Sequence, residues 1–92
     1  MGTIAPVPWV SSDLIAHAKS AVVEPILAAL AAAGAPFAGL LYPGLMVDGD
    51  DVNVLEFNAR FGDPETQSYL RLLETDLLDI LEACVDGRLA SL

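Results

Sequence analysis

The residues with the clearest chemical potential lie in one stretch, Leu55 to Gln67, which reads LEFNARFGDPETQ. Side chains of a strand point alternately to its two faces, so Glu56 and Asn58 are expected to share one face. A carboxylate and an amide oxygen at the end of a strand suit a hard cation such as Mg²⁺, which takes its other ligands from phosphates and water. Arg60 follows, and its guanidinium could hold phosphate oxygens in a fork.

The second half of this stretch predicts a turn and a helix start. Gly62 provides the turn, Asp63 is expected to cap a helix, Pro64 fits the first helical position and Glu65 the first turn. An interpretation without a ligand is also open. In it, Glu56 is a half-buried strand carboxylate paired with Arg60, and Asp63-Pro64-Glu65 only starts a helix.

These residues resemble a known enzyme family, the phosphoribosylamine–glycine ligases, which are ATP-grasp enzymes of purine synthesis. The central match is the run Glu56 to Gln67, which is specific, and shorter matches extend the resemblance over nearly the whole chain. They are Met1 to Pro6, Leu41-Tyr42, Gly44 to Met46, and Leu73 to Leu78.

The resemblance implies an α/β (α+β) fold, with antiparallel strands and flanking helices, that forms part of an ATP-grasp domain. Residues 1–92 would be one partial domain, the C-terminal part of the ATP-grasp domain, whose missing portion would be its main partner. The implied reaction is ATP-dependent joining of glycine to 5-phosphoribosylamine through a glycyl phosphate, with this chain inactive by itself. The alternatives are a non-catalytic remnant or interaction module, and another ATP-grasp ligase of the purine pathway.

The resemblance also implies roles for particular residues. Glu56 and Asn58 would bind Mg²⁺ or Mn²⁺ and link it to ATP, and Arg60 would be the catalytic residue that steadies the transferred phosphoryl group. The residues expected to contact substrate are Gly2 and Thr3 near the start, and Gly62 and Asp63 in the turn, where an anionic or amino end of a substrate would bind.

Composition narrows the functional classes. The formal net charge of −9 argues against nucleic acid and anionic membranes as partners, because both demand a basic surface. Hydrophobic residues make up 54% of the chain and its mean hydropathy is +0.54, more apolar material than a domain of this size can bury. The single cysteine, Cys84, excludes an internal disulfide and fits a cytoplasmic location, and its place on an apolar stretch predicts a core residue.

Periodicity predicts the elements around the motif. A helix kinked at Pro25 is expected from about 12 to 33, with Ser11 or Ser12 as its cap. Short apolar runs at 39–47 and 51–59, joined through Asp-Gly, predict a hairpin in which Pro43 requires an edge or a bulge. Two further helices are expected at 64–73 and 76–85, the latter capped by Thr75 and ended by Gly87.

Several other features favour ordinary structural interpretations. The uncharged run 25–47 is long enough to span a bilayer, but its glycines and prolines favour a helix, turn and strand. His17 has no metal-ligand spacing around it, and Asp48, Asp50 and Asp51 lack the pattern of a calcium loop. Trp9 is expected to be packed against apolar surface.

Overall fold

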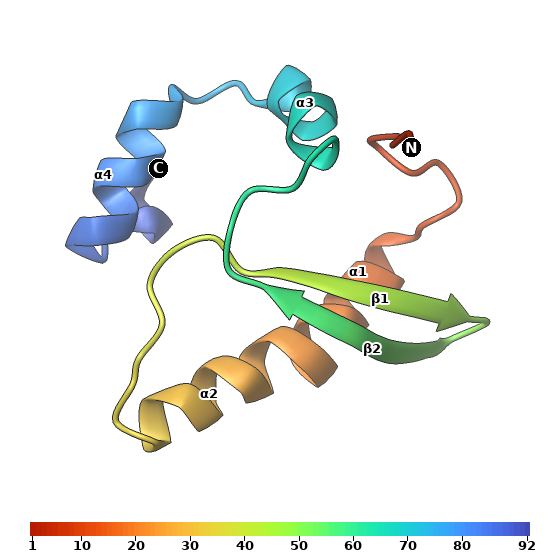
Figure 1. The fold of residues 1–92 in the computed structure, drawn as a ribbon, viewed down its shortest axis with the longest axis horizontal. Helices are drawn as coiled ribbons and strands as arrows, with labels where there is room; N and C mark the ends of the chain where they lie inside the picture. Colours follow the sequence, from red (N-terminus) through yellow and green to blue (C-terminus); the bar gives the residue numbers. More distant parts are fainter.

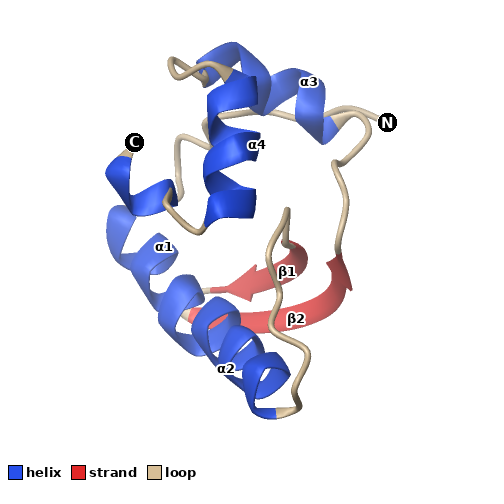
Figure 2. Ribbon diagram, turned by 90° about the vertical axis from the view of Figure 1, so that its left-hand side faces the viewer, coloured by secondary structure: helices blue, strands red, loops and turns tan.

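The computed structural model describes residues 1–92 and has the expected α+β composition (Figure 1). An antiparallel hairpin lies between an N-terminal helix and two shorter helices at the C-terminal end (Figure 2). The α-helices and strands are α1 (Ser12–Ala18), α2 (Glu24–Ala32), β1 (Tyr42–Asp48), β2 (Asp51–Asn58), α3 (Glu65–Tyr69) and α4 (Leu77–Asp86). A π-helical segment, η1 (Lys19–Val23), joins α1 to α2, and 3₁₀ turns η2 (Leu70–Leu72) and η3 (Leu89–Ser91) follow α3 and α4.

The N-terminal helix begins as predicted, because the hydroxyl oxygen of Ser11 accepts a hydrogen bond from the Leu14 amide at 3.1 Å. Its irregularity is the π-helical segment immediately before Pro25. A proline supplies no amide hydrogen and crowds the preceding turn, and a wider π turn gives its ring room. The helix therefore continues past the proline to Ala32, and Gly34 follows with a φ of 79°.

The helical run Ser12–Ala32 has 21 residues and is long and apolar enough to cross a membrane by length and composition. Core helices of soluble proteins meet the same criterion, so this property alone is weak support for a membrane span. The other uncharged run, 25–47, is divided between the end of this helix, a connecting loop and β1.

The two strands form the predicted hairpin with a two-residue turn. Asp48 pairs with Asp51, so Gly49 and Asp50 form the turn. Gly49 has a φ of 61° and Asp50 does not have a positive φ, which is the arrangement of a turn that needs glycine at its first central position.

A β-bulge interrupts the pairing just after Pro43, as the proline predicted. Gly44 pairs with Glu56 and Leu45 pairs with Val54, which leaves Leu55 as an extra residue in β2. The bulge changes which residues of β2 share a face. Strict alternation would put Val54 on the same face as Glu56, but the extra residue places it on the opposite one.

The bulge gives the hairpin one polar and one apolar face, since directly opposed residues of an antiparallel pair share a face. On the polar face, β1 contributes Tyr42, Gly44, Met46 and Asp48, and β2 contributes Asp51, Asn53, Glu56 and Asn58. On the apolar face lie Pro43, Leu45 and Val47 opposite Phe57, Val54 and Val52. Leu45 and Val47 border a shallow apolar hollow with Leu14 and Val23, so the N-terminal helix lies on the apolar side.

The caps of the C-terminal helices differ from the prediction by one residue. Helix α4 is capped by Asp76, whose carboxylate accepts from the Leu78 amide at 2.8 Å, and not by Thr75. Two side-chain caps are possible at adjacent positions, and the carboxylate reaches the helix amide here. Gly87 ends the helix in the left-handed conformation with a φ of 69°, as predicted.

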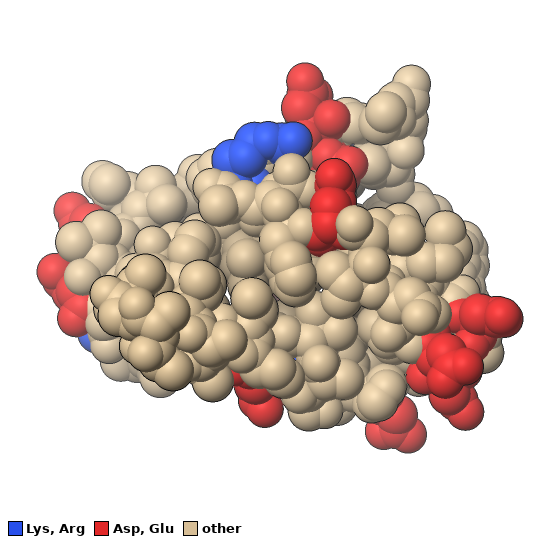
Figure 3. Space-filling model, turned by 60° about the horizontal axis from the view of Figure 1, so that its bottom comes forward, with Lys and Arg blue, Asp and Glu red and all other residues tan.

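Little of the chain is buried. The relation between area and mass for folded monomers gives about 5,100 Å² for 9.7 kDa, whereas the accessible surface is 6853 Å². The radius of gyration is 14.2 Å, against about 12 Å for a compact domain of this length. The face shown in Figure 3 is largely free of charged side chains, and acidic ones gather at its edges. The prediction that Trp9 is packed is wrong, since 77% of it is exposed and too little core forms to cover it.

Ala83 in α4 is the one wholly buried side chain, with an exposed fraction of 0%. We expect Ala83→Leu to lower the free energy of unfolding by about 1–3 kcal/mol, because added methylene groups in a packed site force neighbours apart. Val85→Ala, at a position that is 84% exposed, is the matched control and should change stability by less than about 0.5 kcal/mol. Urea unfolding followed by circular dichroism measures both, and equal effects would contradict the assignment of Ala83 as the centre of packing.

Candidate functional site

The polar end of the hairpin brings together the two residues predicted to bind a metal. Asn58 Nδ2 donates a hydrogen bond to Glu56 Oε1 at 3.0 Å, so both side chains share a face as alternation required. Gly44 lies opposite Glu56, and a Cβ atom there would lie 3.1 Å from Glu56 Cγ. The absence of a side chain at Gly44 therefore leaves the space in which the glutamate lies.

This pair fits a small hard cation. Adjacent ligands of an octahedral Mg²⁺ are about 3.0 Å apart, because each is about 2.1 Å from the metal. Asn58 Nδ2 lies 3.0 Å from Glu56 Oε1 as a hydrogen-bond donor, and a half-turn of the amide would present its oxygen in place of its nitrogen. No group of three or more His, Cys, Asp or Glu side chains in the chain could hold a metal ion, so phosphates and water would supply the remaining ligands.

Arg60 lies just beyond the strand and is exposed. Its guanidinium donates to the Phe61 carbonyl oxygen at 3.0 Å and makes no ion pair, since the ion pairs of the chain are Lys19–Glu24 and Arg88–Asp86. The alternative in which Glu56 simply pairs with Arg60 is therefore not what the structure has. A guanidinium has five N–H donors, and most of them remain available to an anion.

Tyr42 is a member of this cluster that the sequence analysis did not assign to the site. It is the cross-strand partner of Asn58 and is half-buried. Burial raises the pKa of its hydroxyl above the ordinary 10.0, and a hydrogen bond and the charge of Glu65 add to the rise. The charge of Glu56 raises this pKa as well, and the charge of Arg60 lowers it. The direct pairing of Tyr42 with Asn58 became visible only with the strand register.

The turn after the strand differs in detail from the prediction. Pro64, and not Asp63, occupies the cap position of α3, and no side chain caps this helix. Asp63 instead accepts a hydrogen bond from Gln67 Nε2 at 3.1 Å. Gly62 is buried, and a Cβ atom there would collide with the Glu65 carboxylate, so glycine lets that side chain fold back. Two carboxylates at a short helix make this turn suited to an amino group rather than to an anion.

The structure places Gly2 and Thr3 beside a different element. The Thr3 hydroxyl shares a hydrogen bond with the Ser68 hydroxyl in α3, and no hydrogen bond joins Thr3 to Glu56 or Asn58. Gly2 is exposed and has open space around its Cα. The N-terminal segment therefore lies beside the helix that follows the turn, as Figure 1 also shows, and makes no side-chain hydrogen bond to Glu56 or Asn58.

The raised pKa of Tyr42 predicts a titration above pH 10. Its protonated form contributes stability that is fully present below the unfolded-state pKa, near 10, and is lost as the pH rises through the folded pKa. Ultraviolet absorbance in a Tyr69→Phe background isolates this tyrosine, because the chain has two. We expect Glu65→Gln to move the midpoint down toward 10, since it removes the negative charge beside the hydroxyl. An unmoved midpoint would place Glu65 away from Tyr42.

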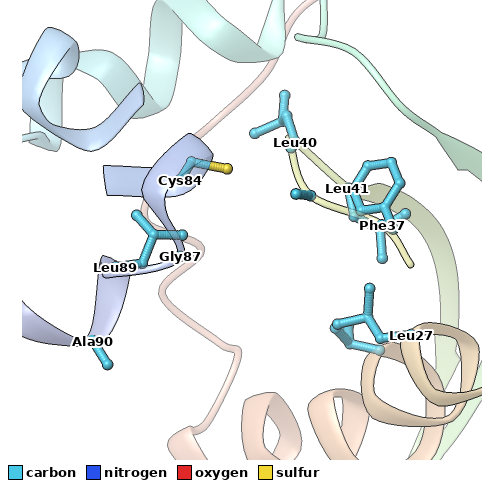
Figure 4. A pocket seen from close by; sticks show the side chains of 11 residues that line it. Leu27, Phe37, Leu40, Leu41, Cys84, Gly87, Leu89 and Ala90 are labelled. Carbon is cyan, nitrogen blue, oxygen red and sulfur yellow. The ribbon is translucent and has the colours of Figure 1, made fainter. Parts of the chain in front are cut away.

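Apolar side chains, not polar ones, line the largest hollow, which measures about 560 Å³ (Figure 4). It lies between Leu27 of α2, the connecting segment with Phe37 and Leu40, and the end of α4. Cys84 faces into this hollow and is only half-buried. It therefore lines an open apolar surface and is not the core residue that the sequence predicted. This lining has no charged side chain that could bind a phosphate or a metal. The end of β2 therefore remains the candidate site.

The arrangement of helices around an antiparallel hairpin is consistent with part of an ATP-grasp domain. Residues 1–66 match the family described as phosphoribosylglycinamide synthetase, ATP-grasp (A) domain, and the chain belongs to this family. The match covers the hairpin, including Glu56 and Asn58, and Arg60.

Curated relatives extend the similarity over the whole chain. It is 48% identical over 90 residues to a phosphoribosylamine–glycine ligase of Xanthomonas axonopodis pv. citri, an alignment covering 97% of this chain and 21% of the relative. It is 46% identical over 92 residues to that of Caldanaerobacter subterraneus subsp. tengcongensis, covering 100% and 22% respectively. A Mycobacterium leprae relative of the same name is 48% identical over 90 residues, covering 98% and 21%. The chain thus spans about a fifth of the length of these relatives.

Proposed function

We propose that this chain contributes the metal and phosphate end of the active site of a ligase that joins glycine to 5-phosphoribosylamine with ATP, by way of a glycyl phosphate. The observation that supports this most directly is that Glu56 and Asn58 lie side by side on one face at the end of β2, near an arginine without an ion pair. The names of the relatives agree with the proposal.

The proposed reaction requires residues that bind the metal ion and the phosphate groups. The glycine carboxylate is an anion that must approach a triphosphate, and the transferred phosphoryl group carries negative charge on its oxygens. A bound Mg²⁺ or Mn²⁺ would neutralise part of that charge, and Glu56 and Asn58 would hold it. Arg60 would bind the transferred phosphoryl group through its free N–H donors.

Substrate contacts are a further part of the proposal. Asp63 and the Gly62 backbone would face the amino group of a substrate, since the turn carries negative charge. Gly2 and Thr3 would contact substrate from the other side of α3, where Thr3 already meets Ser68.

A second candidate is an interaction module without activity. It is favoured by the exposed apolar surface, because large side chains such as Leu55 and Phe57 are 64% and 43% exposed beside the site. In that case the metal-ligand pair would be retained without use.

The test grafts residues 1–92 into the Caldanaerobacter relative in place of the aligned 92 residues, giving what we call the grafted ligase. We expect it to form the glycine amide of phosphoribosylamine in an ATP-dependent manner, and to bind Mn²⁺ in an electron paramagnetic resonance titration. Absence of both would favour the inactive module. Mn²⁺ binding without ligation would separate a surviving metal site from the rest of the reaction.

A further inference from the structure

Gly44 is a glycine in the interior of β1 whose backbone conformation does not require glycine. Four of the seven glycines of the chain have a positive φ, and Gly44 is not among them. In a strand interior a glycine has no side chain to pack and is less favourable than alanine, so it often marks the close approach of another group. The reason for a glycine at this position therefore lies in the residue that faces it.

The group that faces Gly44 is the side chain of Glu56. The two residues are cross-strand partners beside the bulge in which Leu55 is the extra residue. A Cβ atom at position 44 would lie 3.1 Å from Glu56 Cγ, closer than the 3.4–4 Å of an ordinary van der Waals contact, and 3.8 Å from Glu56 Oε1. With any other residue at position 44, the glutamate side chain would have to move by a few tenths of an ångström.

Such a movement would affect a metal site more than it would affect the fold. Glu56 is exposed, so its side chain can move without disturbing a packed core. Its Oε1 atom, however, lies 3.0 Å from Asn58 Nδ2, and any displacement changes the placement of the two ligands relative to each other. Mg²⁺ demands near-ideal octahedral geometry, and a metal site has to hold its ligands within about 0.5 Å of that geometry.

We propose that Gly44 is a positioning residue for the metal site, because the absence of its side chain leaves the room that Glu56 needs to keep its carboxylate beside Asn58. Gly44 supplies no ligand itself and acts through Glu56. The inference deepens the proposed function and rests on it for the identity of the cation.

The first experiment follows the ligand pair without any metal. The side-chain amide signals of Asn58 in NMR spectra of the 92-residue chain report its hydrogen bond to Glu56, and Glu56→Ala gives the signals without that bond. We expect Gly44→Ala to move these signals at least halfway to their positions in Glu56→Ala. Met46→Val is the matched control, since it changes a side chain of the same strand whose cross-strand partner is Asn53, and it should leave the signals in place.

Urea unfolding followed by circular dichroism separates positioning of a ligand from a role in folding. Gly44→Ala should leave the urea midpoint unchanged or raise it, because alanine restricts the unfolded chain and fits a backbone without a positive φ. A lower midpoint or an unfolded variant would show that Gly44 serves the fold, and would overturn the inference.

The second experiment titrates the same chains with Mn²⁺ and follows binding by electron paramagnetic resonance. Gly44→Ala should weaken binding about tenfold, as the loss of a residue that orients a metal ligand does. Gly44→Val should weaken it further because its side chain is larger, and Met46→Val should stay within about twofold of the wild type. In a Glu56→Gln background, Gly44→Ala should have no further effect, because the residue through which it acts is already altered.

The outcomes distinguish this inference from the proposed function. The inference is overturned if Gly44→Ala binds Mn²⁺ as the wild type does, if its effect persists in full in the Glu56→Gln background, if the Asn58 signals stay in place, or if the wild-type chain binds no Mn²⁺. A grafted ligase without activity, together with the expected Mn²⁺ affinities, would overturn the proposed function and leave the inference standing. An active grafted ligase in which Gly44→Ala leaves Mn²⁺ binding unchanged would do the reverse.

Discussion

Replacing Glu56 with Gln in the grafted ligase is expected to lower kcat by about 10²-fold or more, while leaving the fold intact. Gln keeps the shape of the side chain but removes the negative charge that holds a divalent cation, and a catalytic metal supplies several kcal/mol of charge stabilisation. The hydrogen bond from Asn58 can still form, because the amide of Gln keeps an acceptor oxygen. Initial rates with saturating ATP and Mg²⁺ measure the effect.

The matching control separates loss of the metal from loss of structure. Glu74→Gln removes the same charge at an exposed position outside the site and should leave kcat within about twofold. Electron paramagnetic resonance should show that Mn²⁺ binding is weakened in Glu56→Gln and unchanged in the control. Activity above a tenth of the wild-type value would rule out Glu56 as a metal ligand.

The second large effect is expected at Arg60. Replacement by Ala should lower kcat by about 10²- to 10³-fold, because a preorganised donor aimed at developing charge contributes that much. Replacement by Lys should recover only part of the loss, since an ammonium group cannot form the two parallel hydrogen bonds of a guanidinium. Mn²⁺ binding in the absence of ATP should persist in both variants.

Arg71→Ala is the control for this prediction, because Arg71 is also exposed and without an ion pair but lies outside the motif. Its rate should match the wild type. If Arg60→Ala instead raised KM for ATP and left kcat unchanged, Arg60 would bind the ground state and would not act on the transferred group.

The elements could be predicted where one local signal dominated. The Asp-Gly turn predicted the hairpin, Ser11 predicted the helix start, and Gly87 predicted the end of α4. Alternation alone placed Glu56 and Asn58 on one face. Each of these features depends on residues that are only a few positions apart, so the local sequence is enough to predict it.

Features that depend on distant residues could not be predicted in the same way. The pairing of Tyr42 with Asn58 joins β1 to the motif and required the strand register. The cap of α3 differed because Gln67 takes the Asp63 carboxylate that would have served the helix amides. Trp9 stayed exposed because its burial depends on how much core forms, which local pattern does not report.

The bulge at Leu55 sets where the length of β2 could change without rearranging its faces. Val54 and Glu56 flank this extra residue and lie on opposite faces of the hairpin although they are two residues apart. If Leu55 were deleted, Val54 and Glu56 would become adjacent, and strict alternation would keep them on opposite faces. A deletion elsewhere in β2, where no extra residue lies, would turn every residue on one side of the gap to the other face. A one-codon deletion at the bulge would therefore leave the face that Glu56 and Asn58 share intact, whereas the same deletion one codon further along would not.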